Sequence, residues 1–267
     1  MIIRELQCTD AFLKKYITHI TLLEFEADYM GDGIKIPPLG FPVIQFHYGE
    51  MASFYNRPNA PDEAMIIGQI TGYVTITPSK GTKLIGVNFK PYGFYNMFGI
   101  SPLPLQDTLI HANKLFGFNE TEFVLEQVRA VKSDSERFQL VCNFLKKHAK
   151  KFQQSENPVF ERVVKTLIKK NGLVKIKDVV PINSNIRALQ RYFKQQVGIS
   201  PKLFAEILRH RFIVHQISAE PGFDWKHHSL DAFFFDQSHF DRDFQKFSGL
   251  KPIHYDPEAN SLAAFLA

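Results

Sequence analysis

The chain has few cysteines and no long apolar run. Its 267 residues include only two cysteines, Cys8 and Cys142, which lie far apart and form no Cys-x-x-Cys pair. This scarcity excludes a disulfide framework and a cysteine-rich zinc site. No apolar run approaches the ~18 residues that a membrane-spanning helix needs, and the first twenty residues lack the pattern of a secretory signal. We therefore expect a cytoplasmic protein with no membrane partner.

Sequence signals for catalysis are also absent. There is no Gly-x-Gly-x-x-Gly fingerprint, no Gly-Lys-Ser/Thr phosphate loop and no nucleophile motif. His47 and Glu50, in FHYGE, leave a cupin-like metalloenzyme as an alternative, but such a site needs two or three more ligands at strand spacing. We expect no enzyme activity and no cofactor.

Positive charge is concentrated in the second part of the chain. The composition is that of a globular protein, with 45% apolar and 22% charged residues and a net charge of +5. Residues 1–157 hold 16 basic and 16 acidic side chains, whereas residues 158–256 hold 16 basic and 10 acidic ones. A neutral part joined to a basic part indicates one module for packing or ligand binding and another for a polyanion.

The first hundred residues are typical of β-strands. Short segments rich in β-branched and aromatic residues are separated by clusters of Gly, Pro, Asn and Asp. The predicted strands are residues 19–27, 42–49, 65–70, 72–78 and 83–91. Alternating apolar and polar residues in VIQFHY and KLIGVNF indicate that one face of each strand is buried. This pattern predicts a small sandwich or barrel.

Helical spacing of apolar residues begins after Pro91 and continues to the end. The predicted helices are residues 94–99, 119–132, 135–150, 158–170, 176–180, 185–197, 202–217, 224–232 and 237–247, with a short tail near 260. The polar stretch 151–158 ends in Pro, so we place a domain boundary there. The prediction is an α+β chain with a β-rich domain at 1–152, which carries trailing helices, and an all-α domain at 153–267.

The predicted all-α domain contains an internal sequence repeat. RYFKQQVGISP, residues 191–201, resembles RDFQKFSGLKP, residues 242–252. Each copy follows a short predicted helix, a turn and a polar helix start. This order is the helix-turn-helix arrangement. The helix predicted between the two copies, 202–217, would span about 24 Å, so two recognition helices could enter successive major grooves about 34 Å apart.

Both predicted recognition helices have one apolar face and one polar face. The apolar stripes are Ile186, Leu189, Phe193 and Val197 in the first helix, and Phe240, Phe244 and Phe247 in the second. The polar faces carry Arg and Gln, which can read guanine and adenine by paired hydrogen bonds in the major groove, and Lys, which can neutralise phosphates. These faces predict binding to double-stranded DNA.

The same residues resemble a known family. IRALQRYFKQQVGISPKLFAEILRHR and FFFDQSHFDRDFQKFSGLKPIHY resemble the DNA-binding domain of the AraC/XylS transcription regulators. FPVIQFHYG, IIGQITG and LIGVNFKPYGFYNMFGISPLPLQD resemble the less characterised domain that precedes this module in one branch of that family. The resemblance implies two helix-turn-helix motifs, joined by a long helix, that read adjacent major grooves of promoter DNA. It also implies an N-terminal domain that senses a small-molecule effector, forms a homodimer, or does both; RNA polymerase is a further expected partner.

Positions that match the family motif give the expected DNA-binding residues. In the first motif these are Asn185, Arg187, Gln190, Arg191 and Lys194, and in the second they are Gln237, Ser238, His239, Asp241 and Arg242. The sequence departs from the family at Phe233, where Gly is usual, at Pro181, and at the run from His227 to Ser229. These departures leave open an alternative, a small-molecule-binding or interaction protein whose helix-turn-helix has decayed.

Four polar residues of the β-rich part are candidates for holding an effector. Gln45, His47, Gln69 and Asn88 lie in or beside predicted strands rich in aromatic residues. Polar groups of this kind fix the orientation of a ligand in an otherwise apolar pocket.

Overall fold

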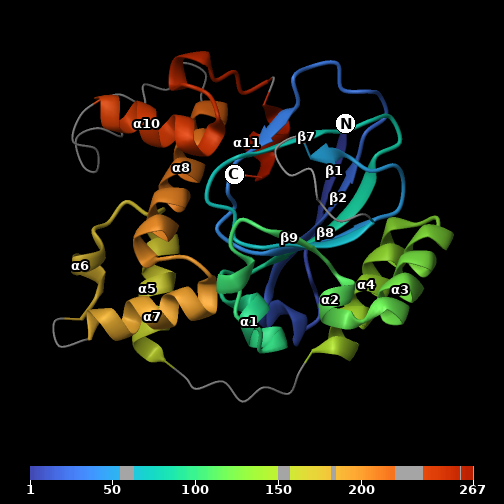
Figure 1. The fold of residues 1–267 in the computed structure, drawn as a ribbon, viewed down its shortest axis with the longest axis horizontal. Coiled ribbons are helices and arrows are strands. Elements are labelled where there is room, and N and C mark those ends of the chain that lie inside the picture. The colour runs from blue at the N-terminus through green and yellow to red at the C-terminus, as the bar shows by residue number, and fades with distance from the viewer. Residues whose placement is uncertain (55–62, 150–156, 182–184, 220–236, 259, 267) are drawn as a thin grey trace.

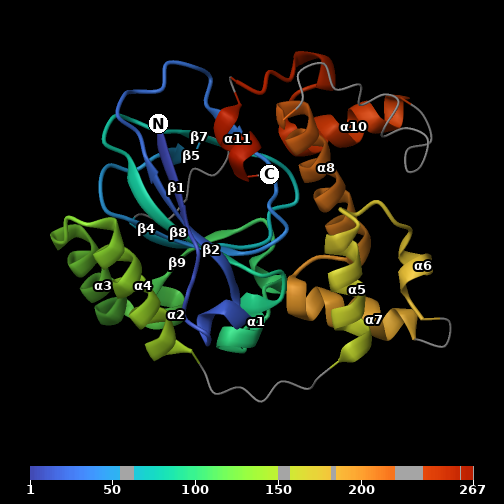
Figure 2. The ribbon, with the colours of Figure 1, turned by 180° about the vertical axis from the view of Figure 1, so that it is seen from behind.

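The fold is mixed α+β, with strands in the N-terminal part and helices in the C-terminal part (Figure 1). A computed structural model describes residues 1–54, 63–149, 157–181, 185–219, 237–258 and 260–266. Figure 2 shows the same two regions from behind, with a column of helices beside the sheets. Among the described helices, none is both long and apolar enough to cross a membrane.

Two antiparallel sheets form the β-rich region. The larger has the order β1-β2-β8-β4-β6-β9, and the smaller has the order β3-β7-β5. The strands of the larger sheet are β1 (Ile2–Leu6), β2 (Ile17–Glu24), β8 (Lys83–Phe89), β4 (Val43–His47), β6 (Ala64–Ile67) and β9 (Leu109–His111). Those of the smaller are β3 (Ile34–Ile36), β7 (Val74–Thr77) and β5 (Ser53–Phe54).

Each central strand of the large sheet buries both faces. In β4, Ile44 and Phe46 belong to the core beneath the helices, whereas Val43, Gln45 and His47 line a pocket on the opposite face. Alternation along a strand produces this division, because successive side chains point to opposite sides. The second face is covered by the small sheet, whose Ile34, Val74 and Ile76 are buried.

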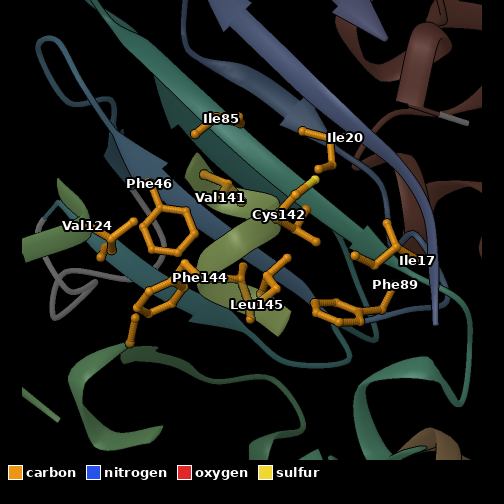
Figure 3. Close-up of a cluster of buried hydrophobic side chains, with 14 of the residues drawn as sticks. Ile17, Ile20, Phe46, Ile85, Phe89, Val124, Val141, Cys142, Phe144 and Leu145 are labelled. Atoms are coloured by element: carbon orange, nitrogen blue, oxygen red, sulfur yellow. The ribbon is translucent and has the colours of Figure 1, made fainter. Parts of the chain in front are cut away.

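Helices pack on the first face of the large sheet. They are α1 (Gly93–Phe98), α2 (Asn113–Phe116), α3 (Phe118–Ala130) and α4 (Asp134–His148). A capping box between Ser133 and Glu136 starts α4. Figure 3 shows Val141, Cys142 and Leu145 of α4 directed at the sheet. Both cysteines are free and buried, and burial raises the pKa of Cys142 to about 12, so this thiol is protonated.

The described residues from 158 onward form only helices and turns. The helices are α5 (Pro158–Lys169), α6 (Ile176–Val179), α7 (Ile186–Val197), α8 (Pro201–Ala219), α10 (Gln237–Ser248) and α11 (Ser261–Leu266). Their core joins α5, α7 and α8 through rings such as Phe160, Phe193 and Phe204. Asn185 caps the start of α7 by accepting a hydrogen bond from the Ala188 amide, and Gly198 ends the helix in the left-handed conformation.

The predicted helices and strands agree with the structure in their type, but their first and last residues often differ. The five predicted strands correspond to β2, β4, β6, β7 and β8, whereas β1, β3, β5 and β9 were not predicted. The prediction of an apolar stripe on α7 was wrong at Ile186, which is 49% exposed because the first turn extends beyond the core. The helix predicted at 224–232 and the domain boundary near 152 lie outside the described residues, as do Phe233 and the run from His227 to Ser229.

Candidate nucleic-acid interface and ligand pocket

The two predicted recognition helices lie at opposite ends of α8. In Figure 1, α10 crosses the upper part of α8, and α7 lies below the lower end of α8, across α5. The 19 residues of α8 span about 28 Å. The apolar side chains Leu189 and Phe193 of α7, and Phe240 and Phe244 of α10, are buried, so the polar faces of both helices turn away from the core.

The C-terminal ends of both helices contact the β-rich region. A Cβ atom built on Gly198, after α7, would lie 3.1 Å from the Gln69 side chain, and one built on Gly249, after α10, would lie 2.9 Å from Tyr73. Both glycines have positive φ, which a left-handed helix end requires. The N-terminal ends of α7 and α10 therefore both point away from the sheets, as Figure 1 shows.

One groove joins the polar face of α7 to α10, but four of the predicted readers of α10 are not among its lining residues: Gln237, Ser238, Asp241 and Arg242. Arg187, Gln190, Arg191 and Lys194 of α7 line it together with His239 and Asp243 of α10, around a volume of about 1090 Å³. Its described lining holds six basic side chains, from Lys and Arg, and two acidic ones, Glu206 and Asp243. A groove with this excess of positive charge attracts a polyanion.

The α7 side of the groove is open to ligand. Arg187, Gln190, Arg191 and Lys194 are exposed, and each is a residue type suited to base edges or phosphate. Asn185 is used differently, because its side chain caps the helix. Sequence reasoning missed Lys175, Lys202 and Arg209, which also line the groove; the basic excess of residues 158–256 was the signal that pointed to them.

On α10, polar side chains bond to one another. Gln237 Nε2 donates to Asp241 Oδ1 at 2.6 Å, and Arg242 Nε donates to the Ser238 carbonyl oxygen at 3.1 Å. His239 Nε2 lies 3.6 Å from Asp243 Oδ2. Ser238 and Arg242 are exposed, whereas Gln237, His239 and Asp241 are partly buried. This helix thus presents a more acidic and more internally bonded face than α7.

A second candidate site is an apolar pocket between the two sheets. It has a volume of about 100 Å³ and is lined by side chains from both sheets and from α11. Three of the four predicted ligand residues, Gln45, His47 and Asn88, line it. Asn88 is buried and donates from Nδ2 to Thr21 Oγ1 at 2.9 Å.

His47 is fully buried in this pocket. Within the described residues, neither of its ring nitrogens has a hydrogen-bond partner. Burial lowers the pKa of His47 to about 4, so the imidazole is neutral at pH 7. No group of three or more His, Cys, Asp or Glu in the described part of the chain could hold a metal ion.

Gln69 does not line this pocket, although it was predicted to hold a ligand. It is buried, and its Nε2 donates to the Gly40 carbonyl oxygen at 3.0 Å. A Cβ atom on Gly40 would lie 3.3 Å from Phe204 of α8, so this loop lies against the helical region. Gln69 therefore lies at the contact between the sheets and the helices, because β6 ends at Ile67 and the strand alternation stops before it.

Comparisons with known proteins add a family match for part of the chain. Residues 9–111 match the model of a family described as a domain of unknown function, DUF6597. No curated protein matches the sequence. One similar solved structure is a single-residue variant of apo ToxT from Vibrio cholerae strain SCE256, at 12% identity over 89% of this chain and 96% of that chain, with a TM-score of 0.46. Another is ToxT from Vibrio cholerae O395 bound to (E)-4-(8-methylnaphthalen-1-yl)but-3-enoic acid, at 10% identity over 100% of both chains, with a TM-score of 0.43.

Proposed function

We propose that the protein is a sequence-specific DNA-binding transcription regulator of the AraC/XylS type. The helices α7 and α10 read two adjacent segments of the major groove of promoter DNA. The β-rich region senses a small molecule, pairs two chains, or does both. The resemblance of the two helix-turn-helix segments to that family supports this proposal.

The observation that carries the proposal is the shared basic groove. Four polar side chains of α7 and two of α10, His239 and Asp243, line one concave surface together with residues of α8. Phe193 of α7 packs against Phe204 near the start of α8, and Phe244 of α10 packs against His210 in its middle, so a single helix positions both proposed recognition helices.

On α7, base reading and phosphate binding fall to different residues. Arg187 and Gln190 stand in the first turns, where side chains reach base edges, and their paired donors and acceptors suit guanine and adenine. Lys194 stands in the last turn, and Lys202 at the start of α8 is 84% exposed, so both are suited to phosphates. Neutralised phosphates release counterions, so affinity falls with salt.

On α10, we assign a smaller share of the affinity. Asp241 and Asp243 repel phosphates, and Gln237 must give up its bond to Asp241 before it can reach a base. This helix contributes mainly to selectivity, through Ser238 and Arg242. The alternative of a protein with a decayed second motif is consistent with the acidic face of α10, so the experiment must separate the two.

The test is selection of bound fragments from genomic DNA, followed by quantitative gel shifts on the recovered site. Arg187→Ala is expected to lose about 1–3 kcal/mol at one base position and to relax the preference there. Arg162→Ala is the control, since Arg162 is an exposed arginine on α5 that does not line the groove.

Recovery of no preferred site, with weak and unselective binding throughout, would contradict the proposal and support the decayed-motif alternative. Equal losses for Arg187→Ala and Arg162→Ala would contradict the assignment of α7 as a recognition helix. Binding of RNA polymerase and formation of a homodimer stay predictions.

A further inference from the structure

The pocket between the sheets has a wall that belongs to the C-terminal helix. Leu262 and Leu266 of α11 line it together with Gln45 and His47 of β4. Leu262 is 2% exposed and packs in the core between the sheets, and α11 lies against β3 and α8. The helix α11 thus completes a cavity whose other lining residues lie between Thr21 and Leu109.

The described lining of the pocket is uncharged. It contains no Lys, Arg, Asp or Glu, and its polar side chains are Thr21, Gln45, His47 and Asn88. The lining side chains give a charged ligand no ion pair in return for its lost hydration, and the Arg211 guanidinium behind the wall is already bonded to the Leu39 and Leu266 carbonyl oxygens. A neutral ligand with an apolar body meets no such penalty.

Within this lining, His47 offers unused hydrogen bonds. Both of its ring nitrogens are buried and without partners among the described residues. The His47 ring has no exposed surface in the cavity as it stands, so a ligand reaches its nitrogens only when neighbouring lining side chains shift. A buried polar group left unpaired costs about 1–3 kcal/mol, and a ligand hydroxyl that bonds to the imidazole would recover this loss. A neutral imidazole can donate from one nitrogen and accept at the other, which suits a hydroxyl group.

The same wall is tied to the helices of the proposed DNA interface. Arg211 of α8 donates from one guanidinium nitrogen to the Leu39 carbonyl oxygen at 2.8 Å and from the other to the Leu266 carbonyl oxygen at 3.4 Å. Its guanidinium also lies over the Phe41 ring, 5.4 Å from the centroid. Leu39, Phe41 and Leu266 all line the pocket, so α8 contacts three of its lining residues.

We propose that a small neutral molecule with an apolar body and one hydroxyl group binds in this pocket against His47, with Leu262 and Leu266 as part of its binding surface. A ligand that fills the cavity contacts Leu262 and Leu266 only when α11 is docked, and these contacts add to those with the sheets. Binding therefore stabilises the docked helix, by the differential affinity of the ligand for the two states. A bound ligand therefore holds α8 against the β-rich region. Any effect of the ligand on DNA binding rests on the proposed function, whereas the existence of the ligand site does not.

The ligand chemistry can be tested with three probes of matched shape. Calorimetry on the full chain would compare para-cresol, para-xylene and para-toluate, which carry a hydroxyl, a methyl and a carboxylate on the same ring. We expect para-cresol to bind and para-toluate not to bind. In a His47→Phe variant, the preference for para-cresol over para-xylene should fall about tenfold. Absence of para-cresol binding, binding of para-toluate as tight as that of para-cresol, or an unchanged preference in His47→Phe would overturn the proposed ligand class.

The role of α11 needs a separate measurement. Replacing both Leu262 and Leu266 by Ala should raise the Kd for para-cresol about tenfold, whereas Phe265→Ala, a 41% exposed position on the same helix, should leave it unchanged. In the unmodified protein, para-cresol should slow amide hydrogen exchange in α11, which requires no variant. Two results would refute the proposal that α11 forms part of the binding surface. One is an equal Kd for the double variant and the unmodified chain, and the other is hydrogen exchange in α11 that para-cresol does not slow.

No DNA enters these measurements, so they separate the two proposals. A chain that binds para-cresol as described and yet selects no DNA site would refute the proposed function alone. A chain that selects a DNA site and binds no para-cresol would refute this inference alone.

Discussion

Lys35 of β3 donates a hydrogen bond from Nζ to the Gly249 carbonyl oxygen, 3.1 Å away, at the C-terminal end of α10. A corresponding bond holds the end of α7, where Ser101 Oγ donates to the Gln195 carbonyl oxygen at 2.8 Å. The β-rich region thus contacts the last turn of both proposed recognition helices. We expect these contacts to determine the distance between the two N-terminal ends.

Lys35→Met should loosen this arrangement. Loss of the bond to Gly249 is expected to lower the free energy of unfolding by about 1 kcal/mol, measured by denaturant titration. It should also weaken discrimination between the selected DNA site and the same site with one base pair inserted between its two halves, measured by gel shift. Lys80→Met is the matched control, because Lys80 is an exposed lysine of the same region whose side chain makes no such bond to the described helices. Discrimination as sharp in Lys35→Met as in the control would show that this contact does not set the spacing.

Lys194→Ala should weaken binding to all DNA sequences by a similar factor. A lysine that contacts phosphate carries no base preference, so the ratio of specific to nonspecific affinity should stay constant. The slope of log affinity against log salt should become about one unit shallower. Lys165→Ala, at a 68% exposed lysine of α5, should change neither quantity. A loss confined to one base pair would mean that Lys194 reads sequence instead.

Acid should destabilise the packing of α8 on α10. His210 lies 5.1 Å from Phe244 and 5.4 Å from Phe247 between ring centroids, and burial lowers its pKa to about 3. Its ordinary pKa of 6.5 applies in the unfolded chain, which therefore binds a proton below pH 6.5 that the folded chain does not bind until about pH 3. The unfolded state binds more protons in that window, so the stability contributed by neutral His210 falls as the pH falls.

His210→Phe should remove this part of the pH dependence. When the pH falls from 7 to 5, the free energy of unfolding should decrease by about 2 kcal/mol less in the variant than in the unmodified protein. Denaturant titrations at the two pH values measure the difference. His47 contributes a loss of the same sign in both proteins, because its pKa is also lowered, to about 4, and so it cancels. Parallel pH profiles would mean that His210 is protonated in the folded state.

Gln69→Leu should affect stability without affecting ligand binding. The substitution leaves the Gly40 carbonyl oxygen without its donor, so the free energy of unfolding should fall by about 1 kcal/mol. Because Gln69 does not line the pocket, the Kd for para-cresol should equal that of the unmodified protein. A changed Kd would place Gln69 in the ligand site after all.

The alternation of apolar and polar residues and the helical spacing of apolar residues predicted the longer strands and helices, which bury many side chains. Val43, Gln45 and His47 share one face of β4 as the alternation requires, which is why two polar residues of this strand line the pocket. The strands β3, β5 and β9 have two or three residues each and show too little alternation to be recognised. Leu262 and Leu266 have the four-residue spacing of a helix face, but the sequence does not say which surface that face covers.

The attachment of each proposed recognition helix at its C-terminal end also has a mechanical consequence. A helix of 12 residues is about 18 Å long, so a tilt of about 5° at the attached end displaces the far end by about 1.5 Å. That displacement exceeds the range of distances over which a hydrogen bond to a base forms. A small rotation of the β-rich region about Gly198 and Gly249 would therefore move the N-terminal ends of α7 and α10 far enough to form or break hydrogen bonds to bases. No helix would need to unfold.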